Sequence, residues 1–353
     1  MRCPILQDLP KPPEGRNGWP WTEESPQLGG FMQDGSIWKK ISIVTPSFNQ
    51  GQYIEETIRS VLLQGYPNYE YLIIDGGSTD DTIAIIRKYE KWISYWCSEK
   101  DNGQASGINK GFKMASGDII AWINSDDFYQ KNVFLTVALN FAKGDFDFLY
   151  GNINIVNEES EVVKRSNVSK YNIIDKFCYM VVPQPACFWR YKVFSTEGYL
   201  DENYHYHFDS EYWIRCSLKN KFFYINDILS SFRLHTYSKT VNKWEDFLIE
   251  SIFLAETYLC SYTIGLPYNV IKEKNNILGF LNERIGHYYL LTKQMKNARK
   301  YFIKSIILRK FRIQNIIILC YIIDTITYSS FGKSIQELIK RKKVLFNRKA
   351  RIG

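Results

Sequence analysis

The sequence predicts an α/β fold, a doubly wound sheet of parallel strands that is followed by a helical C-terminal extension. Short apolar stretches alternate with segments of helical periodicity between residues 41 and 123, which is the order of strands joined by crossover helices. Crossovers of this kind are right-handed. From residue 244 onward the pattern is helical almost throughout, so the expected strands all precede it.

Four strands and three helices follow one another in the first part of the chain. Each expected strand is a short, mostly apolar run, as in a parallel sheet that is buried on both faces. These strands are expected at 41–44, 69–74, 93–97 and 119–123, and the helices at 53–63, 82–92 and 105–115. Shorter, mixed elements are expected from 128 to 243, with strands at 148–155, 186–190 and 222–225 and a helix within 204–218.

Composition and periodicity divide the chain into three expected parts. Residues 1–37 contain several Pro, Gly and Trp without periodicity and predict an irregular N-terminal arm, which Trp19, Trp21 and Trp38 could anchor. The α/β domain is expected at 38–243 and a basic helical region at 244–353. Within that region, residues 285–308 resemble one helix pair of a tetratricopeptide-like array, although a single pair does not establish an array.

Charge is distributed unevenly along the chain. The basic tail, residues 290–353, contains 16 Lys and Arg against 2 Asp and Glu and carries a net charge of +14. Because the whole chain carries +8, the residues before the tail carry the difference, a net charge of −6. This asymmetry favours contact of the tail with an anionic membrane, an acidic polymer or a partner. A solvated helical surface is the alternative.

The cysteines and the apolar stretches predict the compartment. Seven scattered cysteines, without a CxxC pair, argue against a disulfide framework and favour a reducing compartment. The N-terminus lacks the apolar segment of a signal peptide, and residues 316–323 are far fewer than the ~20 of a membrane span. We therefore expect a cytoplasmic protein, in peripheral contact with the inner face of the cell membrane through its tail, with no nucleic-acid partner.

Three of the expected strands end in polar turns, at residues 45–49, 75–80 and 124–127. In open α/β sheets, ligands bind beyond the carboxyl ends of the strands. One Asp at a strand end is unremarkable, but three polar ends in such an order predict a site at one edge of the sheet.

The turn at 75–80 contains a candidate ligand for a nucleotide base. The carboxylate of Asp75 could accept a hydrogen bond from the N3–H of uracil or thymine, and the two glycines that follow let a planar ligand approach the backbone. The alternative is a turn with a helix cap, because Ser78, Thr79 and Asp80 are capping residue types. Both interpretations can hold, with Asp80 capping and Asp75 binding.

The next loop and helix could complete this pocket. Asp101 and Gln104 follow the third strand and could contact the base, and Lys110, on the helix, could neutralise phosphate. Taken alone, Lys110 is more typical of a solvated helix residue.

The turn at 124–127 places Asp126 and Asp127 side by side after a very apolar strand. Clustered carboxylates are costly unless a cation lies among them. Mg²⁺ and Mn²⁺ prefer oxygen ligands and often bridge to substrate phosphates, where they stabilise a leaving diphosphate. The alternative is a helix cap after a strand, and the turn alone does not decide between the two.

Two later segments contain candidate acid–base and phosphate residues. Asp209 and Glu211 are two positions apart on an expected helix and so point in different directions. One could deprotonate a hydroxyl, and Glu211 could pair with Arg215, four residues later. Arg233 and His235 are phosphate-binding types, and His235 could also ligate a metal.

These motifs, in this order, resemble glycosyltransferase family 2 with the GT-A fold, over about residues 40 to 240. The resemblance rests on the following residues: Ile43-Val44-Thr45-Pro46-Ser47-Phe48-Asn49, Asp75-Gly76-Gly77-Ser78-Thr79-Asp80, Asp101-Asn102-Gly103-Gln104, Asn109-Lys110-Gly111, Asn124-Ser125-Asp126-Asp127, and Asp209 with Trp213-Ile214-Arg215.

The resemblance implies a GT-A, nucleotide-diphospho-sugar transferase fold with a doubly wound mixed sheet, and an inverting transfer in one step. The donor would be a nucleotide-sugar, a UDP-sugar first, and the acceptor a hydroxyl of a glycan or lipid-linked glycan in surface polysaccharide synthesis. The expected nucleotide-binding residues are Thr45, Pro46, Asn49, Asp75, Asp101, Gln104, Lys110, Asn124 and Ser125.

The resemblance also assigns the reacting groups. The base falls on Asp209, and the family's metal-binding DxD falls on residues 124–126, where Asp126 keeps the metal-side carboxylate for Mn²⁺ or Mg²⁺. His235 is a further metal candidate, and Asp127 and Arg233 are candidates for contact with phosphate or acceptor.

One departure from the family pattern is Asn124, which replaces the first Asp of DxD. An amide can still bond a ribose hydroxyl, but it is a weaker, neutral metal partner, so weaker metal binding is expected.

Other functions fit the sequence less well. A non-catalytic nucleotide-sugar or glycan-binding module would keep Asp75 but lose the base, and Asp209 and Asp126 argue against it. A nucleotidyltransferase usually has a Gly-rich, basic loop after the first strand, which residues 46–51 lack. No GxGxxG follows that strand, which excludes a nicotinamide-binding domain.

Overall fold

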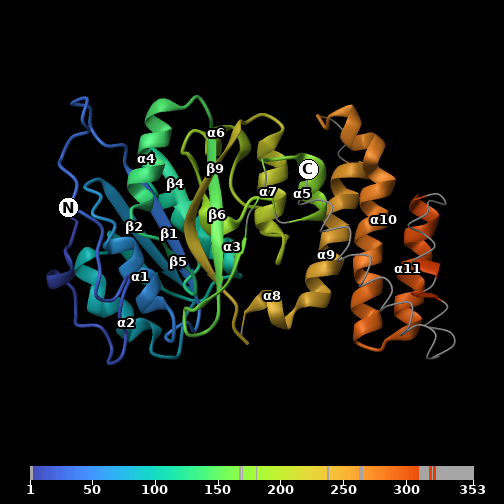
Figure 1. The fold of residues 1–353 in the computed structure, drawn as a ribbon, viewed down its shortest axis with the longest axis horizontal. Coiled ribbons are helices and arrows are strands. Elements are labelled where there is room, and N and C mark those ends of the chain that lie inside the picture. The colour runs from blue at the N-terminus through green and yellow to red at the C-terminus, as the bar shows by residue number, and fades with distance from the viewer. Residues whose placement is uncertain are drawn as a thin grey trace, which may run out of the picture. The chain divides into compact units, whose positions relative to one another are not determined.

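The computed structural model describes residues 3–166, 168, 170–179, 181–236, 238–261, 265–309, 318–319 and 321–322 (Figure 1). The chain separates into two compact units, 1–242 and 243–353. We describe each unit by itself.

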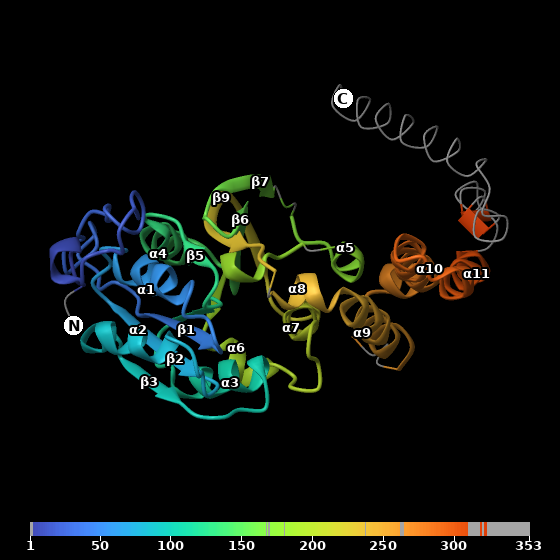
Figure 2. The same ribbon diagram turned by 90° about the horizontal axis from the view of Figure 1, so that it is seen from below.

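Four parallel strands begin the sheet of the first unit, in the order β3-β2-β1-β4. They match the four strands that the sequence predicts. The strands are β1 (Ile41–Ser47), β2 (Tyr69–Asp75), β3 (Tyr95–Ser98) and β4 (Ile119–Trp122). Their crossover helices are α1 (Ile54–Leu62), α2 (Thr82–Tyr89) and α3 (Gln104–Met114). In Figure 2, α1 and α2 cover one face of these strands, and α3 packs on β1 and β2 from the other.

The rest of the sheet is mixed, and the full order is β3-β2-β1-β4-β8-β6-β9-β5, with β7 paired to β6. These strands are β5 (Phe128–Tyr129), β6 (Phe148–Val156), β7 (Val162–Ser166), β8 (Cys187–Arg190) and β9 (Phe222–Arg233). Strand β8 runs antiparallel to β4 and β6, whereas β9 runs parallel to β6. The mixed sheet implied by the family resemblance is therefore confirmed, and the parallel part stops at β4.

Strand β9 is longer than the sequence predicts, with 12 residues instead of the four at 222–225. The residues beyond the predicted four, 226–233, include Asn226, Asp227, Ser230 and Ser231 and lack an apolar pattern. Ser230 and Ser231 are nevertheless buried, because β9 lies between β6 and β5. This extension carries the chain to the turn that follows β4.

Short helices complete the first unit. They are α4 (Val133–Lys143), α5 (Ile173–Cys178), α6 (Val193–Glu197), α7 (Phe208–Ser217), α8 (Lys239–Asn242) and the 3₁₀ turns η1 (Leu6–Asp8), η2 (Glu90–Trp92) and η3 (Gln184–Ala186).

The segment before β1 contains little regular structure, only η1 and a bridge between Phe31 and Ile37. It is fixed by side chains instead. The indole of Trp19 donates to the Tyr129 carbonyl at 2.7 Å. The buried guanidinium of Arg59, on α1, donates to the Pro20 and Trp21 carbonyls at 3.0 and 2.8 Å.

Three tryptophans form the centre of the aromatic core. Trp122, Trp189 and Trp213 are fully buried, with ring centroids 5.5 to 5.7 Å apart. They pack against one another and do not face solvent. The stacked pair of Trp122 and Trp213 joins β4 to α7.

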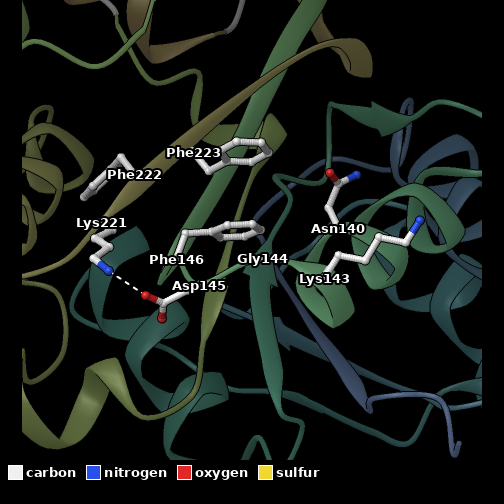
Figure 3. Close-up of a pocket in the computed structure, with 8 residues that line it drawn as sticks. All are labelled: Asn140, Lys143, Gly144, Asp145, Phe146, Lys221, Phe222 and Phe223. Atoms are coloured by element: carbon white, nitrogen blue, oxygen red, sulfur yellow. Dashed lines mark hydrogen bonds and ion pairs between the residues drawn. The ribbon is translucent and has the colours of Figure 1, made fainter.

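An open pocket lies where β6 and β9 begin (Figure 3). The rings of Phe146 and Phe223 stack there, with centroids 4.7 Å apart. The ammonium of Lys221 bonds the Asp145 carboxylate at 2.6 Å. The polar strand ends described below lie at the other end of these strands.

The second unit is helical, with α9 (Trp244–Glu256), a π-helical segment (Thr257–Ser261), α10 (Tyr268–Leu291) and α11 (Met295–Arg309). Helix α10 packs against α9 and α11, and a Cβ at Gly286 would stand only 2.6 Å from the Phe302 ring. A tetratricopeptide-like role stays a prediction. Most of the basic tail lies outside the described residues. No helix in the described part of the chain is long and apolar enough to cross a membrane.

Candidate active site

The carboxyl ends of β1 and β2 meet, as the sequence predicts. The Asn49 N–H donates to Ser78 Oγ at 2.7 Å, and Asn49 Oδ1 accepts from the Thr79 N–H at 2.9 Å. The Gly76 N–H donates to the Ser47 carbonyl at 2.8 Å. The expected nucleotide residue Asn49 therefore ties the two turns together.

Asp75 is fully buried, and its carboxylate is satisfied within its own turn and by the neighbouring strand. It accepts from the N–H groups of Gly77 and Ser78 at 3.0 and 2.8 Å, from the Ser78 hydroxyl, and from Ser98 Oγ at 2.7 Å. These bonds favour the turn interpretation, and a contact of Asp75 with a base stays a prediction.

Asp101 lies against the same turn. Its Oδ2 is 3.0 Å from the positions that a Cβ would take at Gly76 and at Gly107, so a side chain at either position would press against this carboxylate. Its Oδ1 accepts from the Gly103 N–H at 2.8 Å. The structure thus brings Asp75 and Asp101 together, as expected of a base pocket.

The other expected nucleotide residues are placed differently. The buried Thr45 hydroxyl bonds Tyr71 Oη at 3.1 Å, and Pro46 is also buried in β1. Neither side chain faces an open site. The Lys110 ammonium bonds Glu99, which raises the pKa of Lys110, and it bonds Cys97 Sγ at 3.2 Å. Lys110 is therefore tied to the end of β3, and its phosphate contact stays a prediction.

Asp126 and His235 contact each other, although they lie 109 residues apart in the sequence. Nε2 of His235 is 3.0 Å from Oδ2 of Asp126. The imidazole is buried, and in the described part of the chain its Nδ1 has no hydrogen-bond partner; the centroid of the Tyr53 ring lies 4.7 Å from that of the imidazole. The Asp126 side chain is 19% exposed, so one face of the pair is open to a ligand. These are the two residues predicted to bind metal.

Asp127 lies beneath this pair and is almost completely buried. Its Oδ1 accepts from the Arg233 N–H at 2.9 Å, and its Oδ2 has no hydrogen-bond partner among the described residues. Burial raises the pKa of the Asp127 carboxyl well above its usual range, and the charge of Asp126 raises it further, whereas Arg233 lowers it. Direct contact of Asp127 with phosphate or acceptor stays a prediction that its burial does not favour.

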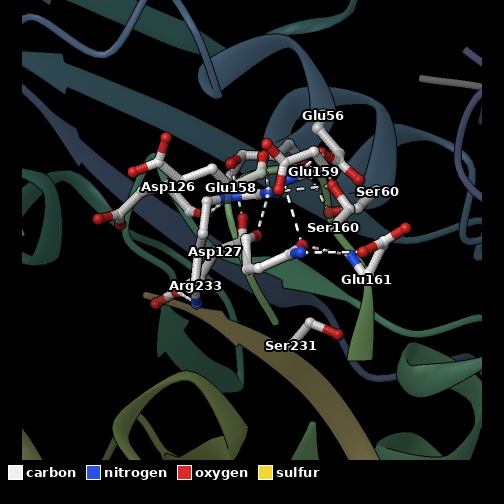
Figure 4. Close-up of polar contacts among 12 residues, drawn as sticks. Glu56, Ser60, Asp126, Asp127, Glu158, Glu159, Ser160, Glu161, Ser231 and Arg233 are labelled. Carbon is white, nitrogen blue, oxygen red and sulfur yellow. Dashed lines mark hydrogen bonds and ion pairs between the residues drawn. The ribbon is translucent and has the colours of Figure 1, made fainter. Parts of the chain in front are cut away.

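Arg233 ends β9 and is used entirely inside the protein (Figure 4). Its guanidinium pairs with the buried Glu56 carboxylate at 2.8 Å and donates to the Asp126 carbonyl at 2.9 Å. It also donates to Ser160 Oγ at 2.9 Å and to the Glu158 carbonyl at 3.0 Å. A phosphate contact by Arg233 is therefore not favoured, and the guanidinium instead fixes the backbone of the β4 turn.

A divalent cation fits the Asp126–His235 pair. Among the residues that the structure describes, no three His, Cys, Asp or Glu side chains are grouped to hold an ion. Mg²⁺ is usually held by one or two carboxylates together with substrate phosphates and water. One carboxylate and one imidazole thus suffice for a cation that takes its other ligands from phosphate and water.

The remaining residues of the acidic turn are linked to α3. Asn124 Oδ1 accepts from Gln104 Nε2 at 2.8 Å, so two expected nucleotide residues touch. Asn124 Nδ2 donates to Gln184 Oε1 at 3.1 Å. Ser125 is buried beside them. Gln184 was not among the sequence candidates, because nothing in residues 183–186 distinguishes it from an ordinary loop amide.

Asp209 lies in the first turn of α7, and its Oδ1 accepts from the Ser210 N–H at 2.6 Å. Trp213, one helical turn later and so on the same face, stacks on Trp122, the last residue of β4. This stacking directs the Asp209 face of α7 towards β4. The expected pairing of Glu211 with Arg215 is confirmed, with two bonds of 2.8 Å.

A buried lysine lies close to Asp209 and was missed by the sequence analysis. Lys176, on α5, donates to Ser210 Oγ at 3.2 Å. Burial lowers the pKa of the Lys176 ammonium, and the negative charge of Asp209 acts in the opposite direction. A lysine within an apolar helix (Ile173–Cys178) is a weak signal, because such residues usually reach solvent.

Comparison with known proteins relates residues 42–215 to a known family. The model of glycosyl transferase family 2 matches residues 42–215. An uncharacterised glycosyltransferase of Rickettsia conorii is 30% identical over 284 residues, 72% of this chain and 46% of that protein. The glucosyltransferase WfgD of Escherichia coli is 35% identical over 141 residues, 39% of this chain and 56% of that protein. The chain thus spans about half the length of these relatives.

Solved structures show the fold. Staphylococcus aureus TarS 1–349, in complex with UDP-GlcNAc, superposes with a TM-score of 0.54 at 16% identity, covering 78% of this chain and 93% of that chain. The mannosyltransferase PcManGT of Pyrobaculum calidifontis, with GDP-Man and Mn²⁺, also superposes with a TM-score of 0.54, at 11% identity, covering 88% and 85%. Together with the mixed sheet, these likenesses establish the GT-A fold. Through residues 42–215, the chain belongs to glycosyltransferase family 2.

Proposed function

We propose that this chain transfers a sugar, with inversion, from a nucleotide-sugar donor to a hydroxyl of a glycan or lipid-linked acceptor. The observation that carries the proposal is the contact of Asp126 with His235 beyond the end of β4. A UDP-sugar is the first donor to test, because TarS was solved with UDP-GlcNAc and WfgD is named for UDP-Glc. WfgD is also named for a diphosphoundecaprenol-linked acceptor, which suggests a lipid-linked glycan here.

Asp126 and His235 would hold Mn²⁺ or Mg²⁺. When bound, such a cation stabilises the negative charge that develops on the leaving diphosphate. The buried Arg233 supports this role indirectly, because its guanidinium fixes the carbonyl of Asp126 at 2.9 Å. The base pocket would be formed by the turns that contain Asp75 and Asp101.

Asp209 would act as the general base. Its carboxylate takes the proton of the acceptor hydroxyl as that oxygen attacks the anomeric carbon. The bond between this carbon and the diphosphate oxygen breaks on the opposite side, and the nucleoside diphosphate leaves with the electron pair. One such displacement inverts the configuration of the sugar.

The substitution Asp209→Asn tests this assignment. We expect transfer to fall by about 10²- to 10⁴-fold, the usual contribution of a general base, with UDP affinity changed less than about threefold. Turnover is measured as nucleotide release across UDP-, dTDP- and GDP-sugars, and UDP affinity by calorimetry. Asp227→Asn, at an exposed position of β9, is the matched control.

The outcomes separate the alternatives. If Asp209→Asn keeps near-normal turnover, Asp209 is not the base. If the unmodified chain binds UDP but neither releases nucleotide nor transfers sugar from any donor, it is a non-catalytic nucleotide-sugar-binding module.

Metal removal tests the cation. EDTA should lower activity, and added Mn²⁺ or Mg²⁺ should restore it. With one carboxylate and one imidazole as protein ligands, the cation should stay bound only while free cation is present in solution. Full activity in excess chelator would remove the metal role from Asp126 and His235.

The basic tail would hold the protein at an anionic membrane, since residues 290–353 carry a net charge of +14. The intact chain should sediment with phosphatidylserine or phosphatidylglycerol vesicles and remain in the supernatant with neutral ones at moderate salt. Equal sedimentation with both vesicle types would contradict a role for the tail charge.

A further inference from the structure

Four side chains beyond the end of β4 form one continuous hydrogen-bonded chain, which we name the amide chain. Lys239 Nζ donates to Gln104 Oε1 at 3.1 Å, and Gln104 Nε2 donates to Asn124 Oδ1 at 2.8 Å. Asn124 Nδ2 donates to Gln184 Oε1 at 3.1 Å, and Gln184 Nε2 donates to the Trp122 carbonyl at 2.8 Å. The chain joins α8, α3, the β4 turn and η3, which are distant in sequence.

The two ends of the amide chain fix the direction of every bond in it. An ammonium group can only donate, and a peptide carbonyl can only accept. Each of the three amides between Lys239 and the Trp122 carbonyl must therefore accept on one side and donate on the other. None of them can be turned over without placing two donors or two acceptors against each other.

Position 124 consequently requires a side chain that both accepts and donates. An ionised aspartate there could accept from Gln104, but it could not donate to Gln184. Gln184 would then either present its oxygen to the carboxylate or turn over and lose its bond to Trp122. A buried polar group that is left unpaired destabilises the folded state. This requirement explains why the first position of the DxD motif is Asn in this chain.

We propose that Asn124 and Gln184 are positioning residues of the transfer reaction and that Asn124 is not a weakened metal ligand. Both polar atoms of the Asn124 side chain are used by its neighbours in the amide chain. Lys239 follows His235 by four residues, and the Ser238 N–H donates to the His235 carbonyl at 3.1 Å. The amide chain thus holds the segment that carries His235 against the turn that carries Asp126. The role in transfer rests on the proposed function.

The substitution Asn124→Asp distinguishes the two roles of position 124. If Asn124 is a link in the amide chain, Asn124→Asp should lower kcat at least about tenfold, the equivalent of one hydrogen bond. The Mn²⁺ concentration for half-maximal activity should not fall. Gln184→Met, which keeps the volume of the side chain, should lower kcat by a similar factor. In Asn124→Asp/Gln184→Met, the two losses should not multiply, because either change breaks the same chain.

A matched control is Gln64→Glu, which puts a carboxylate into another buried amide site. Gln64 donates to the carbonyls of Ser60 and Gln130 at 2.8 Å and is not part of the amide chain. It should lower the thermal midpoint as Asn124→Asp does but leave kcat within about twofold. Tighter Mn²⁺ binding with undiminished kcat in Asn124→Asp would overturn the proposal, and so would losses that multiply in the double variant.

A second measurement does not depend on activity. In a cycle of Asn124→Ala, Gln184→Ala and the double variant, the shifts in thermal midpoint should be clearly less than additive. Additive shifts would overturn the amide chain even if transfer is confirmed. If instead the chain transfers no sugar but the shifts are coupled, the proposed function fails while the amide chain stands.

Discussion

The turns that follow β2 and β4 contain similar residues but use their carboxylates in opposite ways. The Asp75 carboxylate accepts four hydrogen bonds, from Gly77, Ser78 and Ser98, and is satisfied within the protein. In the β4 turn, one carboxylate oxygen of Asp127 has no hydrogen-bond partner among the residues that the structure describes, and the Asp126 carboxylate contacts the His235 imidazole. The two turns therefore differ in whether the protein itself satisfies their carboxylate oxygens, although their sequences look alike.

The difference arises from where the donors come from. The β2 turn obtains most of its donors from within three residues, so it closes on itself as soon as it forms. The β4 turn obtains its donors from β9, more than 100 residues away. The arrangement of the β4 turn therefore depends on tertiary structure.

The largest expected effect comes from removing the support of the β4 turn. Arg233→Met leaves the Glu56 carboxylate buried without its 2.8 Å partner, which should lower the free energy of unfolding by about 3–5 kcal/mol. Urea unfolding measures this loss. The double variant Glu56→Met/Arg233→Met should recover a substantial part of it, because no charge remains buried. No recovery would mean that the backbone contacts of Arg233 dominate.

The β2 turn should respond less strongly, because only one side chain changes and no charge is stranded. In Asp75→Asn, an amide nitrogen replaces one of the accepting oxygens, which should cost about 2 kcal/mol in urea unfolding. UDP affinity should fall less than about tenfold, since the bonds lost are internal. A loss of about a hundredfold in UDP affinity with unchanged stability would instead make Asp75 a base-contacting residue.

The buried carboxyl group of Asp127 predicts a substitution that stabilises the folded protein, in contrast to the two preceding ones. Burial raises the pKa of Asp127 in the folded protein, whereas the unfolded value is about 3.9. The folded state therefore loses stability relative to Asp127→Asn as pH rises from about 4 to the folded pKa. Asp127→Asn should therefore be more stable than the unmodified chain at pH 7, and this difference should shrink as the pH falls towards 3. A constant difference across this range would contradict the raised pKa.

Local patterns predict the fold and the residue types of the site. The strands up to Trp122 follow from short apolar runs, and the polar turns at 75–80 and 124–127 follow directly from their ends. Asn124 follows β4, and Gln104 begins α3. Both therefore lie at the carboxyl edge of the predicted parallel strands, where their side chains touch.

The sequence does not predict which hydrogen-bond partners these side chains have. The acceptors around Arg233 come from α1 and from the residues between β6 and β7, and Glu56 lies 177 positions away. The role of Gln184 depends on the Trp122 carbonyl, which no side-chain pattern reports. Such pairings are set by tertiary packing, so Arg233 reads from the sequence as a phosphate ligand and is found as a buried support.

The smallest expected effect concerns a carboxylate–ammonium pair at the beginning of β9, which matches Glu56–Arg233 in chemistry but not in burial. Asp145 and Lys221 are 2.6 Å apart, and their side chains are 96% and 69% exposed. The bond to Lys221 lowers the pKa of Asp145, but solvent screens the pair, so Lys221→Met should leave the urea midpoint unchanged within error. A clear loss of stability in Lys221→Met would show that the stacked rings of Phe146 and Phe223 depend on this pair. Burial would then no longer explain why the ion pair of Arg233 contributes more to stability than that of Lys221.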